Sequence, residues 1–118
     1  MSYFTYQNQT LHAEQLALPA LIAEYATPLF VYSATALRDA YQAYAQAFAA
    51  QDTLICFAMK ANSNLSILRL FAEQGAGFDI VSGGELARAL AAGANPQKIV
   101  FSGVGKSAEE IRAALAAN

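Results

Sequence analysis

The stretch LICFAMKANSN, Leu54 to Asn64, places one lysine at the end of an apolar run and directly before polar residues. A run this short predicts a buried strand that delivers its last side chain to a loop. Lysine is rarely buried without a reason, and burial lowers the ammonium pKa because the charged form loses hydration. The neutral amine attacks carbonyl groups to form a Schiff base. Lys60 is therefore a candidate for holding an aldehyde cofactor, and the alternative is a lysine whose head group extends into water.

Segments typical of strands and helices alternate from this stretch to the end of the chain. Gly75 and Gly93 stand where two of the helices are expected to end. Ser82 and Ser107 each precede a glutamate by three residues, the form of a capping box at a helix start. Such alternation predicts parallel strands joined by right-handed crossovers, which is an α/β fold. The predicted pairs are strand 54–59 with helix 65–74, strand 78–81 with helix 85–92, and strand 99–102 with helix 108–117.

Polar residues stand near corresponding ends of these strands. Lys60, Asp79 and Ser102 follow one another at similar intervals along the chain, so we expect them at one rim of the sheet. The carboxyl-terminal rim holds the active site in a (β/α)8 barrel, which typically takes about 250 residues. Three units alone also fit a three-stranded doubly wound sheet.

The first 35 residues have a more mixed pattern than the rest of the chain. Short runs on either side of Gln7-Asn8-Gln9 indicate a hairpin, and Thr27-Pro28 is typical of a helix end. We therefore divide the chain into an N-terminal segment, 1–35, and a second region, 36–118. The expected elements are a hairpin of residues 4–6 and 10–12, a helix from Pro19 to Ala26, a strand at 29–32, and a helix whose apolar stripe is Leu37, Tyr41, Tyr44 and Phe48.

The composition narrows the class of protein. The chain has 118 residues, 56% hydrophobic and 14% charged, as expected of a globular domain. A net charge of −2 without a basic cluster predicts no nucleic-acid partner, and no apolar stretch is long enough to predict a membrane span. The start lacks the features of a signal peptide, and the single Cys56 cannot form an intrachain disulfide, so we expect a cytoplasmic protein. Cys56 is interpreted as a core residue and His12 as a surface residue, and no metal site is predicted.

Three ordered blocks carry a resemblance to a known family. They are FAMKANSN at residues 57–64, GFDIVS at 77–82 with GEL at 84–86, and VFSGVGK at 100–106. Together they resemble the diaminopimelate decarboxylases, which make lysine from meso-diaminopimelate with pyridoxal 5'-phosphate (PLP). The resemblance runs from about Phe4 to the last residue. Ornithine decarboxylases and alanine racemases share the fold and a lysine in a related block, but their next residues differ from those at 61–64.

The resemblance implies a fold and a set of site residues. The chain would be the first three βα units of a PLP-binding (β/α)8 barrel, preceded by a segment of a β-rich domain. Lys60 would form the Schiff base with PLP, Asp79 would place a carboxylate close to the lysine and cofactor, and Glu85 would face the lysine. From the residues alone, Glu85 fits a capping role beside Ser82 equally well. Asp79 also fits a carboxylate bonded to a loop N–H, and Lys106 fits a solvated loop charge.

The implied reaction releases CO2 from meso-2,6-diaminopimelate and leaves L-lysine, the last step of bacterial lysine biosynthesis. The family also implies a homodimer, with the phosphate-binding loop and other site residues further along the chain. This chain alone is therefore expected to be inactive. Other classes stay open: an ornithine- or arginine-type decarboxylase, a non-catalytic PLP carrier, and a structural domain without enzymatic activity.

Overall fold

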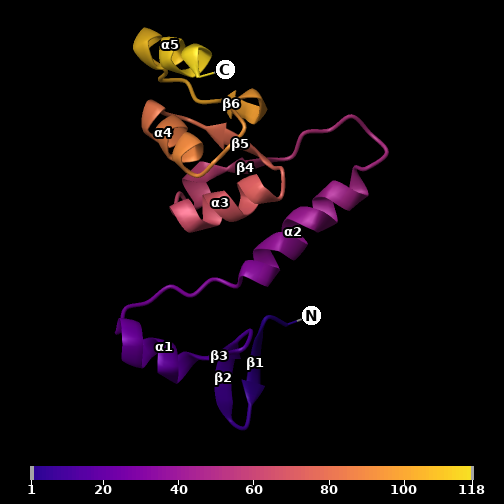
Figure 1. The fold of residues 1–118 in the computed structure, drawn as a ribbon, viewed down its shortest axis with the longest axis vertical. Coiled ribbons are helices and arrows are strands. Elements are labelled where there is room, and N and C mark those ends of the chain that lie inside the picture. The colour runs from indigo at the N-terminus through magenta and orange to yellow at the C-terminus, as the bar shows by residue number, and fades with distance from the viewer. Residues whose placement is uncertain (1, 118) are drawn as a thin grey trace. The chain divides into compact units, whose positions relative to one another are not determined.

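The computed structural model describes residues 2–117. Two compact units divide the chain at Asp39 and Ala40, within helix α2 (Ala34–Ala47). Each unit has a three-stranded sheet of its own, in the order β1-β2-β3 in the first and β4-β5-β6 in the second (Figure 1). The first sheet is antiparallel and the second is parallel.

The first unit begins with the predicted hairpin. Strands β1 (Phe4–Gln7) and β2 (Thr10–Ala13) pair with Gln7 beside Thr10. The turn between them consists of Asn8 and Gln9, both with positive φ, 47° and 64°, as a tight hairpin turn requires. His12 is half-buried, and its Nδ1 lies 3.0 Å from the Thr10 carbonyl oxygen. The surface position expected for His12 is therefore met only in part.

The rest of the first unit differs from expectation at its strands. Strand β3 (Leu16–Ala17) joins β2, and two residues are too few for a sequence pattern to predict it. Residues 29–32 belong to no helix or strand of the described chain, so the strand predicted there is wrong. An extended segment becomes part of a sheet only where a neighbour supplies hydrogen-bond partners. The predicted helix is present as α1 (Leu18–Tyr25), with Pro19 in its first turn.

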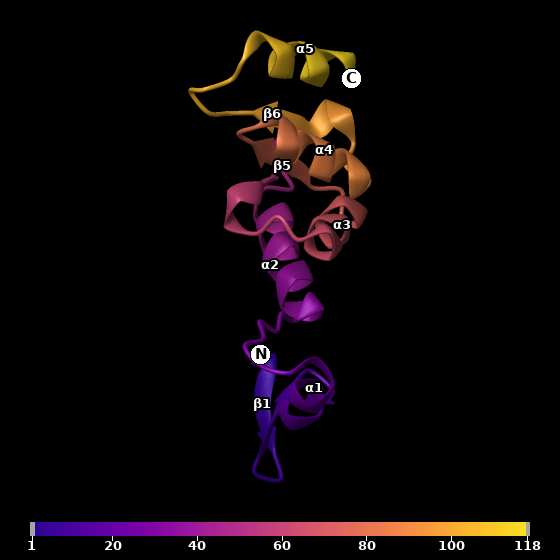
Figure 2. The same cartoon turned by 90° about the vertical axis from the view of Figure 1, so that its left-hand side faces the viewer.

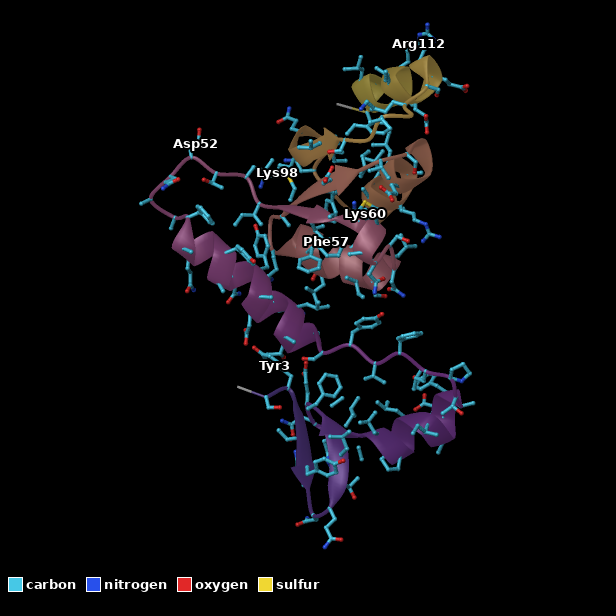
Figure 3. All side chains as sticks on the ribbon, turned by 180° about the vertical axis from the view of Figure 1, so that it is seen from behind. Tyr3, Asp52, Phe57, Lys60, Lys98 and Arg112 are labelled. Atoms are coloured by element: carbon cyan, nitrogen blue, oxygen red, sulfur yellow. The ribbon has the colours of Figure 1, made fainter. Side chains whose placement is uncertain are left out.

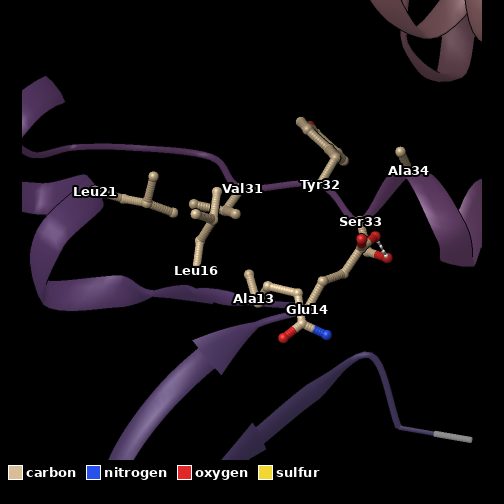
Figure 4. A pocket seen from close by; sticks show the side chains of 9 residues that line it. Ala13, Glu14, Leu16, Leu21, Val31, Tyr32, Ser33 and Ala34 are labelled. Carbon is tan, nitrogen blue, oxygen red and sulfur yellow. Dashed lines mark hydrogen bonds between the residues drawn. The ribbon is translucent and has the colours of Figure 1, made fainter.

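Polar contacts join β2 to the start of α2. Ser33, which is buried, caps α2 by accepting a 2.9 Å hydrogen bond from the Ala36 N–H. The Glu14 carboxylate accepts hydrogen bonds from the Ser33 hydroxyl and from the Thr35 N–H, and these bonds lower the pKa of Glu14. Beside this cluster the side chains of Leu16, Leu21 and Val31 line a hollow of about 270 Å³ (Figure 4).

The second unit has the predicted alternation of strands and helices, which confirms the α/β class. Its first strand is shorter than predicted: it ends at Ala58 because Met59–Ala61 forms a turn of 3-10 helix, η1. Figure 2 shows α3 and α4 on the same side of the strands. The elements are β4 (Cys56–Ala58), α3 (Leu65–Glu73), β5 (Gly77–Ile80), α4 (Gly83–Ala91), η2 (Pro96–Lys98), β6 (Ile99–Phe101) and α5 (Ala108–Ala116).

The core of this unit lies between the sheet and its helices. Phe57 of β4 stacks on Phe71 of α3, with ring centroids 4.3 Å apart, and Phe57 lies beside Phe78 of β5. Phe78 and Ile80 are fully buried. Because side chains alternate across a strand, Asp79 between them belongs to the opposite face of the sheet. We call this the helix-free face, meaning the face of β4, β5 and β6 that carries Ala58, Asp79 and Val100.

A close backbone contact fixes the start of β5. A Cβ atom on Gly77 would lie 2.5 Å from the Lys98 carbonyl oxygen and 2.7 Å from the Cys56 Sγ, so only a hydrogen atom fits there.

Among the described helices, none combines the length and apolar character needed to cross a membrane.

Candidate active site

Lys60 lies in η1, directly after β4 (Figure 3). Its side chain is exposed in the described chain, so the burial expected from the apolar run is not found. The physical reason is the early end of β4. Lys60 follows the strand by two positions and lies in a turn outside the sheet, whereas its predecessor Met59 is fully buried.

The loop behind Lys60 is held by hydrogen bonds. The Asn62 side chain accepts one from the Asn64 N–H at 3.0 Å, and the Asn64 side chain caps α3 by accepting one from the Ser66 N–H at 2.9 Å. Asn64 is therefore the N-cap of α3, a position that asparagine favours. Arg88 of α4 also donates a 3.2 Å hydrogen bond to the Ser63 carbonyl. No local pattern indicates this last contact, because the two residues are 25 positions apart.

The strand register relates Lys60 to Asp79 and Ser102. Ala58, Asp79 and Val100 lie side by side on β4, β5 and β6, at equal intervals along the chain. The three polar residues are not equally spaced, since the interval from Lys60 to Asp79 is shorter than that from Asp79 to Ser102. Lys60 and Ser102 each come two positions after the row that contains Asp79. All three are near the carboxyl end of the sheet, with Asp79 one pleat repeat earlier.

Asp79 has a carboxylate oxygen without a partner. Its Oδ1 is buried and accepts no hydrogen bond from the residues that the structure describes. Burial, and secondarily the negative charge of Asp79, raise the pKa of the Cys56 thiol. A raised pKa keeps the thiol protonated and unreactive. Cys56 is half-buried and does not belong to the buried core, so the interpretation of Cys56 as a core residue is met only in part. The Oδ1 of Asp79 is therefore open to a donor from outside the described residues.

Glu85 has a local structural contact at the start of α4. Its Oε2 accepts a 2.7 Å hydrogen bond from the Val81 N–H, and its own N–H donates to the Ser82 hydroxyl at 3.2 Å. The predicted capping box is therefore half present, because the carboxylate bonds one residue before Ser82. The second predicted box, Ser107 with Glu110, is complete.

Lys106 differs from its expected role as a solvated loop charge. Its Nζ donates hydrogen bonds to the carbonyls of Ser102 and Gly103, at 3.2 and 2.7 Å, and lies 5.5 Å from the centre of the Phe101 ring. These contacts fix the loop after β6. Lys106 therefore has a structural role that composition alone did not predict.

The residues present fit an aldehyde cofactor. Within residues 2–117 no cluster of three metal-binding side chains occurs. Lys60 offers an exposed primary amine, the group that bonds to an aldehyde carbon. Asp79 offers a buried oxygen that lacks a donor, on the neighbouring strand and the helix-free face. An amine and a carboxylate near the carboxyl end of the sheet thus suit an aldehyde cofactor.

Comparison with known proteins identifies the class. Residues 34–118 match the family described as pyridoxal-dependent decarboxylase, pyridoxal binding domain. The chain belongs to this family, and membership implies pyridoxal phosphate as the cofactor.

The relatives narrow the class further. The chain is 58% identical to diaminopimelate decarboxylase from Neisseria meningitidis serogroup B, over 90% of this chain and 26% of that protein. It is 51% identical to diaminopimelate decarboxylase from Pseudomonas aeruginosa, over 98% of this chain and 28% of that protein. The crystal structure of diaminopimelate decarboxylase from M. jannaschii in co-complex with L-lysine matches with a TM-score of 0.94 at 33% identity, covering 99% of this chain and 28% of that chain.

The chain thus spans about a quarter of the length of the curated relatives that it matches. The resemblance inferred from the three sequence blocks is confirmed, because these relatives carry the name that it predicted.

Proposed function

We propose that the full-length protein catalyses the PLP-dependent decarboxylation of meso-2,6-diaminopimelate to L-lysine and CO2, the last step of bacterial lysine biosynthesis. The main support is the position of Lys60 after β4 beside Asp79 on β5, whose Oδ1 has no partner among the described residues, in a chain 58% identical to a diaminopimelate decarboxylase. The M. jannaschii relative provides further support, since the L-lysine in that structure is the product expected of this reaction.

Each site residue has a proposed role. Lys60 would hold the cofactor by its Nζ, and its amine would also move a proton at the reacting carbon. Bound PLP supplies an electron sink for the pair left at Cα when CO2 departs. Asp79 places its carboxylate close to Lys60 and the cofactor, and its negative charge stabilises positive charge there. Glu85 has two roles: its carboxylate accepts the hydrogen bond from Val81, and in the complete site it also faces Lys60.

We also propose that the second unit is part of a larger barrel. The chain would provide the first three βα units of a PLP-binding (β/α)8 barrel, in region 36–118, while segment 1–35 would belong to a β-rich domain. The parallel order and the equal spacing of paired positions from β4 to β5 and from β5 to β6 support repeated βα units. Val100, 48% exposed on the helix-free face, suits a surface that further strands would enclose.

The remaining proposals concern partners and location. The substrate is a small amino acid, the full-length enzyme is a cytoplasmic homodimer, and neither nucleic acid nor membrane takes part. Light scattering on the full-length enzyme should give twice the mass of one chain. The 118-residue chain alone should bind PLP weakly and release no CO2. Tight PLP binding with CO2 release by this chain would contradict that proposal.

The decisive experiment measures CO2 release by the full-length protein from meso-diaminopimelate, ornithine and arginine. We expect diaminopimelate to be decarboxylated to lysine and the other two to react poorly. A preference for ornithine would assign the protein to a sister decarboxylase. Release of CO2 from none of the three, with PLP still bound, would indicate a carrier.

A second experiment tests the lysine. Borohydride reduction of the full-length protein with PLP should fix the cofactor covalently on Lys60, as peptide mass spectrometry will show. Lys60→Arg should abolish turnover while the fold is retained, because arginine keeps the charge but forms no comparable imine. Lys98→Arg and Lys106→Arg are the matched controls and should keep the adduct on Lys60. An adduct found on Lys98 or Lys106 of the wild-type protein, or lost in either control variant, would overturn the assignment.

A further inference from the structure

One carboxylate in α5 bonds to the starts of two different helices. The Oε1 of Glu110 accepts a 2.8 Å hydrogen bond from the N–H of Gly83, the first residue of α4. Its Oε2 accepts bonds from the N–H and the hydroxyl of Ser107, at 2.9 and 3.0 Å, where α5 begins. Glu110 therefore completes its own helix cap and also satisfies an N–H group 27 positions earlier.

The local chemistry suits this double role. The first N–H groups of a helix have no intrahelical acceptor and attract negative charge. The bonds from Ser107 and Gly83 lower the pKa of Glu110, which keeps the carboxylate charged. A Cβ atom on Gly83 would lie 3.1 Å from the Glu110 Cγ, a tight contact that would require a small shift of the Glu110 side chain.

The contacted N–H lies in the turn that carries Glu85. Within residues 81–85, the bonds of Ser82 and Glu85 are made inside the turn itself. Glu110 is the one side chain from elsewhere in the described chain that bonds to this turn. It thus links the third βα unit to the second just after β5, the strand of Asp79.

We propose that Glu110 is a positioning residue: by holding the Gly83 N–H it fixes the turn 81–85 and, with it, the carboxylate of Glu85. This inference rests on the proposed function, in which Glu85 faces the lysine. Small displacements of groups near the reacting atoms reduce turnover strongly, so a residue without contact to the cofactor can still set the rate.

The test uses the full-length enzyme with PLP and compares Glu110→Ala, Glu110→Gln and Glu109→Gln. Glu109 is the matched control, since it is acidic and lies in the same first turn of α5. We expect Glu110→Ala to lower kcat about tenfold while KM changes less than about twofold, and to shift the visible absorbance of the bound cofactor. Glu110→Gln should fall between Glu110→Ala and wild type because the amide keeps one acceptor oxygen. Glu109→Gln should resemble the wild type.

Two further measurements separate positioning from helix capping. Ser107→Ala removes the hydroxyl of the α5 cap but leaves the Glu110 bond to Gly83, so it should lower Tm and leave kcat near wild type. Hydrogen exchange of peptides covering residues 81–86 should accelerate in Glu110→Ala and not in Ser107→Ala. Unchanged exchange in Glu110→Ala, unchanged kcat and absorbance, or an equal loss in Glu109→Gln would each overturn the proposal.

Failure of the proposed function gives a different result. If the wild-type enzyme releases no CO2 from diaminopimelate, that function is wrong, whatever the variants do. The exchange and absorbance readouts for Glu110 need no substrate and still decide whether it holds the turn. If another amino acid is the substrate, the ratio of kcat values is measured with that amino acid.

Discussion

The two units of this chain bury their side chains to very different extents. In the first unit, the buried residues of the described chain are Ala13 and Ser33, while Tyr6 and Phe30 are 74% and 84% exposed. In the second unit, large side chains such as Phe78, at 0% exposure, fill the space between sheet and helices. The comparison shows that two units with helices and strands can be stabilised by different interactions, one with few buried side chains and the other with a packed core.

Hydrogen bonds take the place of a core in the first unit. The β1–β2 ladder, the contacts of Glu14 with Ser33 and Thr35, and a 2.8 Å bond from the Tyr3 hydroxyl to Asp39 connect its elements. Each such bond contributes about 0.5–1.5 kcal/mol net, whereas a large buried side chain contributes more. Stability should therefore respond more strongly to changes in the second unit.

The largest effect is expected at the centre of the second core. Phe78→Ala should lower the free energy of unfolding by about 3–5 kcal/mol, because it removes a fully buried ring and leaves a cavity. Tyr6→Ala, its counterpart in the first unit, should change that value by less than about 0.5 kcal/mol. Urea unfolding measures both. Equal losses in the two variants would contradict the contrast between the units.

The next effect tests backbone packing. Gly77→Ala should cost about 1–3 kcal/mol, since its Cβ would meet the Lys98 carbonyl oxygen at 2.5 Å and backbone atoms must move. Gly84→Ala is the control, because a Cβ there meets only the Ser82 hydroxyl at 3.8 Å. Thermal unfolding should show a lower Tm for Gly77→Ala alone. A Tm equal to wild type for Gly77→Ala would show that the backbone at Lys98 moves away from β5 at little cost.

A cap should be the most sensitive point of the first unit. Ser33→Ala removes the acceptor of the Ala36 N–H and the donor to Glu14, and should cost about 1 kcal/mol. Hydrogen exchange at residues 34–37 should become faster, with exchange in β4, β5 and β6 unchanged. Faster exchange in both units would show that they unfold as one.

The smallest expected effect is a dependence of the free energy of unfolding on pH, to which both units contribute. Glu14 and Glu110 both have lowered pKa values in the folded chain, from hydrogen bonds to Ser33 and Ser107 respectively. A lowered carboxyl pKa contributes stability above the unfolded value, about 4.3, and this is lost as pH falls through the folded value. The stability difference between wild type and Glu14→Gln or Glu110→Gln should therefore be constant near neutral pH and shrink in acid. A difference that grows in acid would contradict both assignments.

Local patterns predicted much of this fold. The hairpin about Asn8, the alternation of strands and helices, and the capping box of Ser107 with Glu110 all depend on neighbours in sequence. The strand expected at 29–32 failed because a strand needs a partner, which no local pattern contains.

The candidate site was predicted less completely than the fold. The spacing of the polar residues predicted Lys60 and Asp79 at one end of the sheet. The exposure of Lys60 was not predicted, because it depends on the residue at which β4 ends. The offset of Asp79 by one pleat repeat depends on strand register, which the spacing of polar residues does not reveal. The bond between Glu110 and Gly83 joins residues 27 positions apart and has no sequence signal beyond the local capping box.

The length of chain between paired strands also has a consequence for the order in which the units fold. Gln7 pairs with Thr10 across a turn of two residues, and hairpins of this kind close in about 1–10 μs. Each parallel pair joins strands on either side of a helix, so that helix and two loops must be arranged before the first ladder bond forms. As the chain leaves the ribosome, the hairpin should therefore form and reopen many times before β4 finds β5. We therefore expect the unit with the smaller core to form its first strand pair earlier than the other unit.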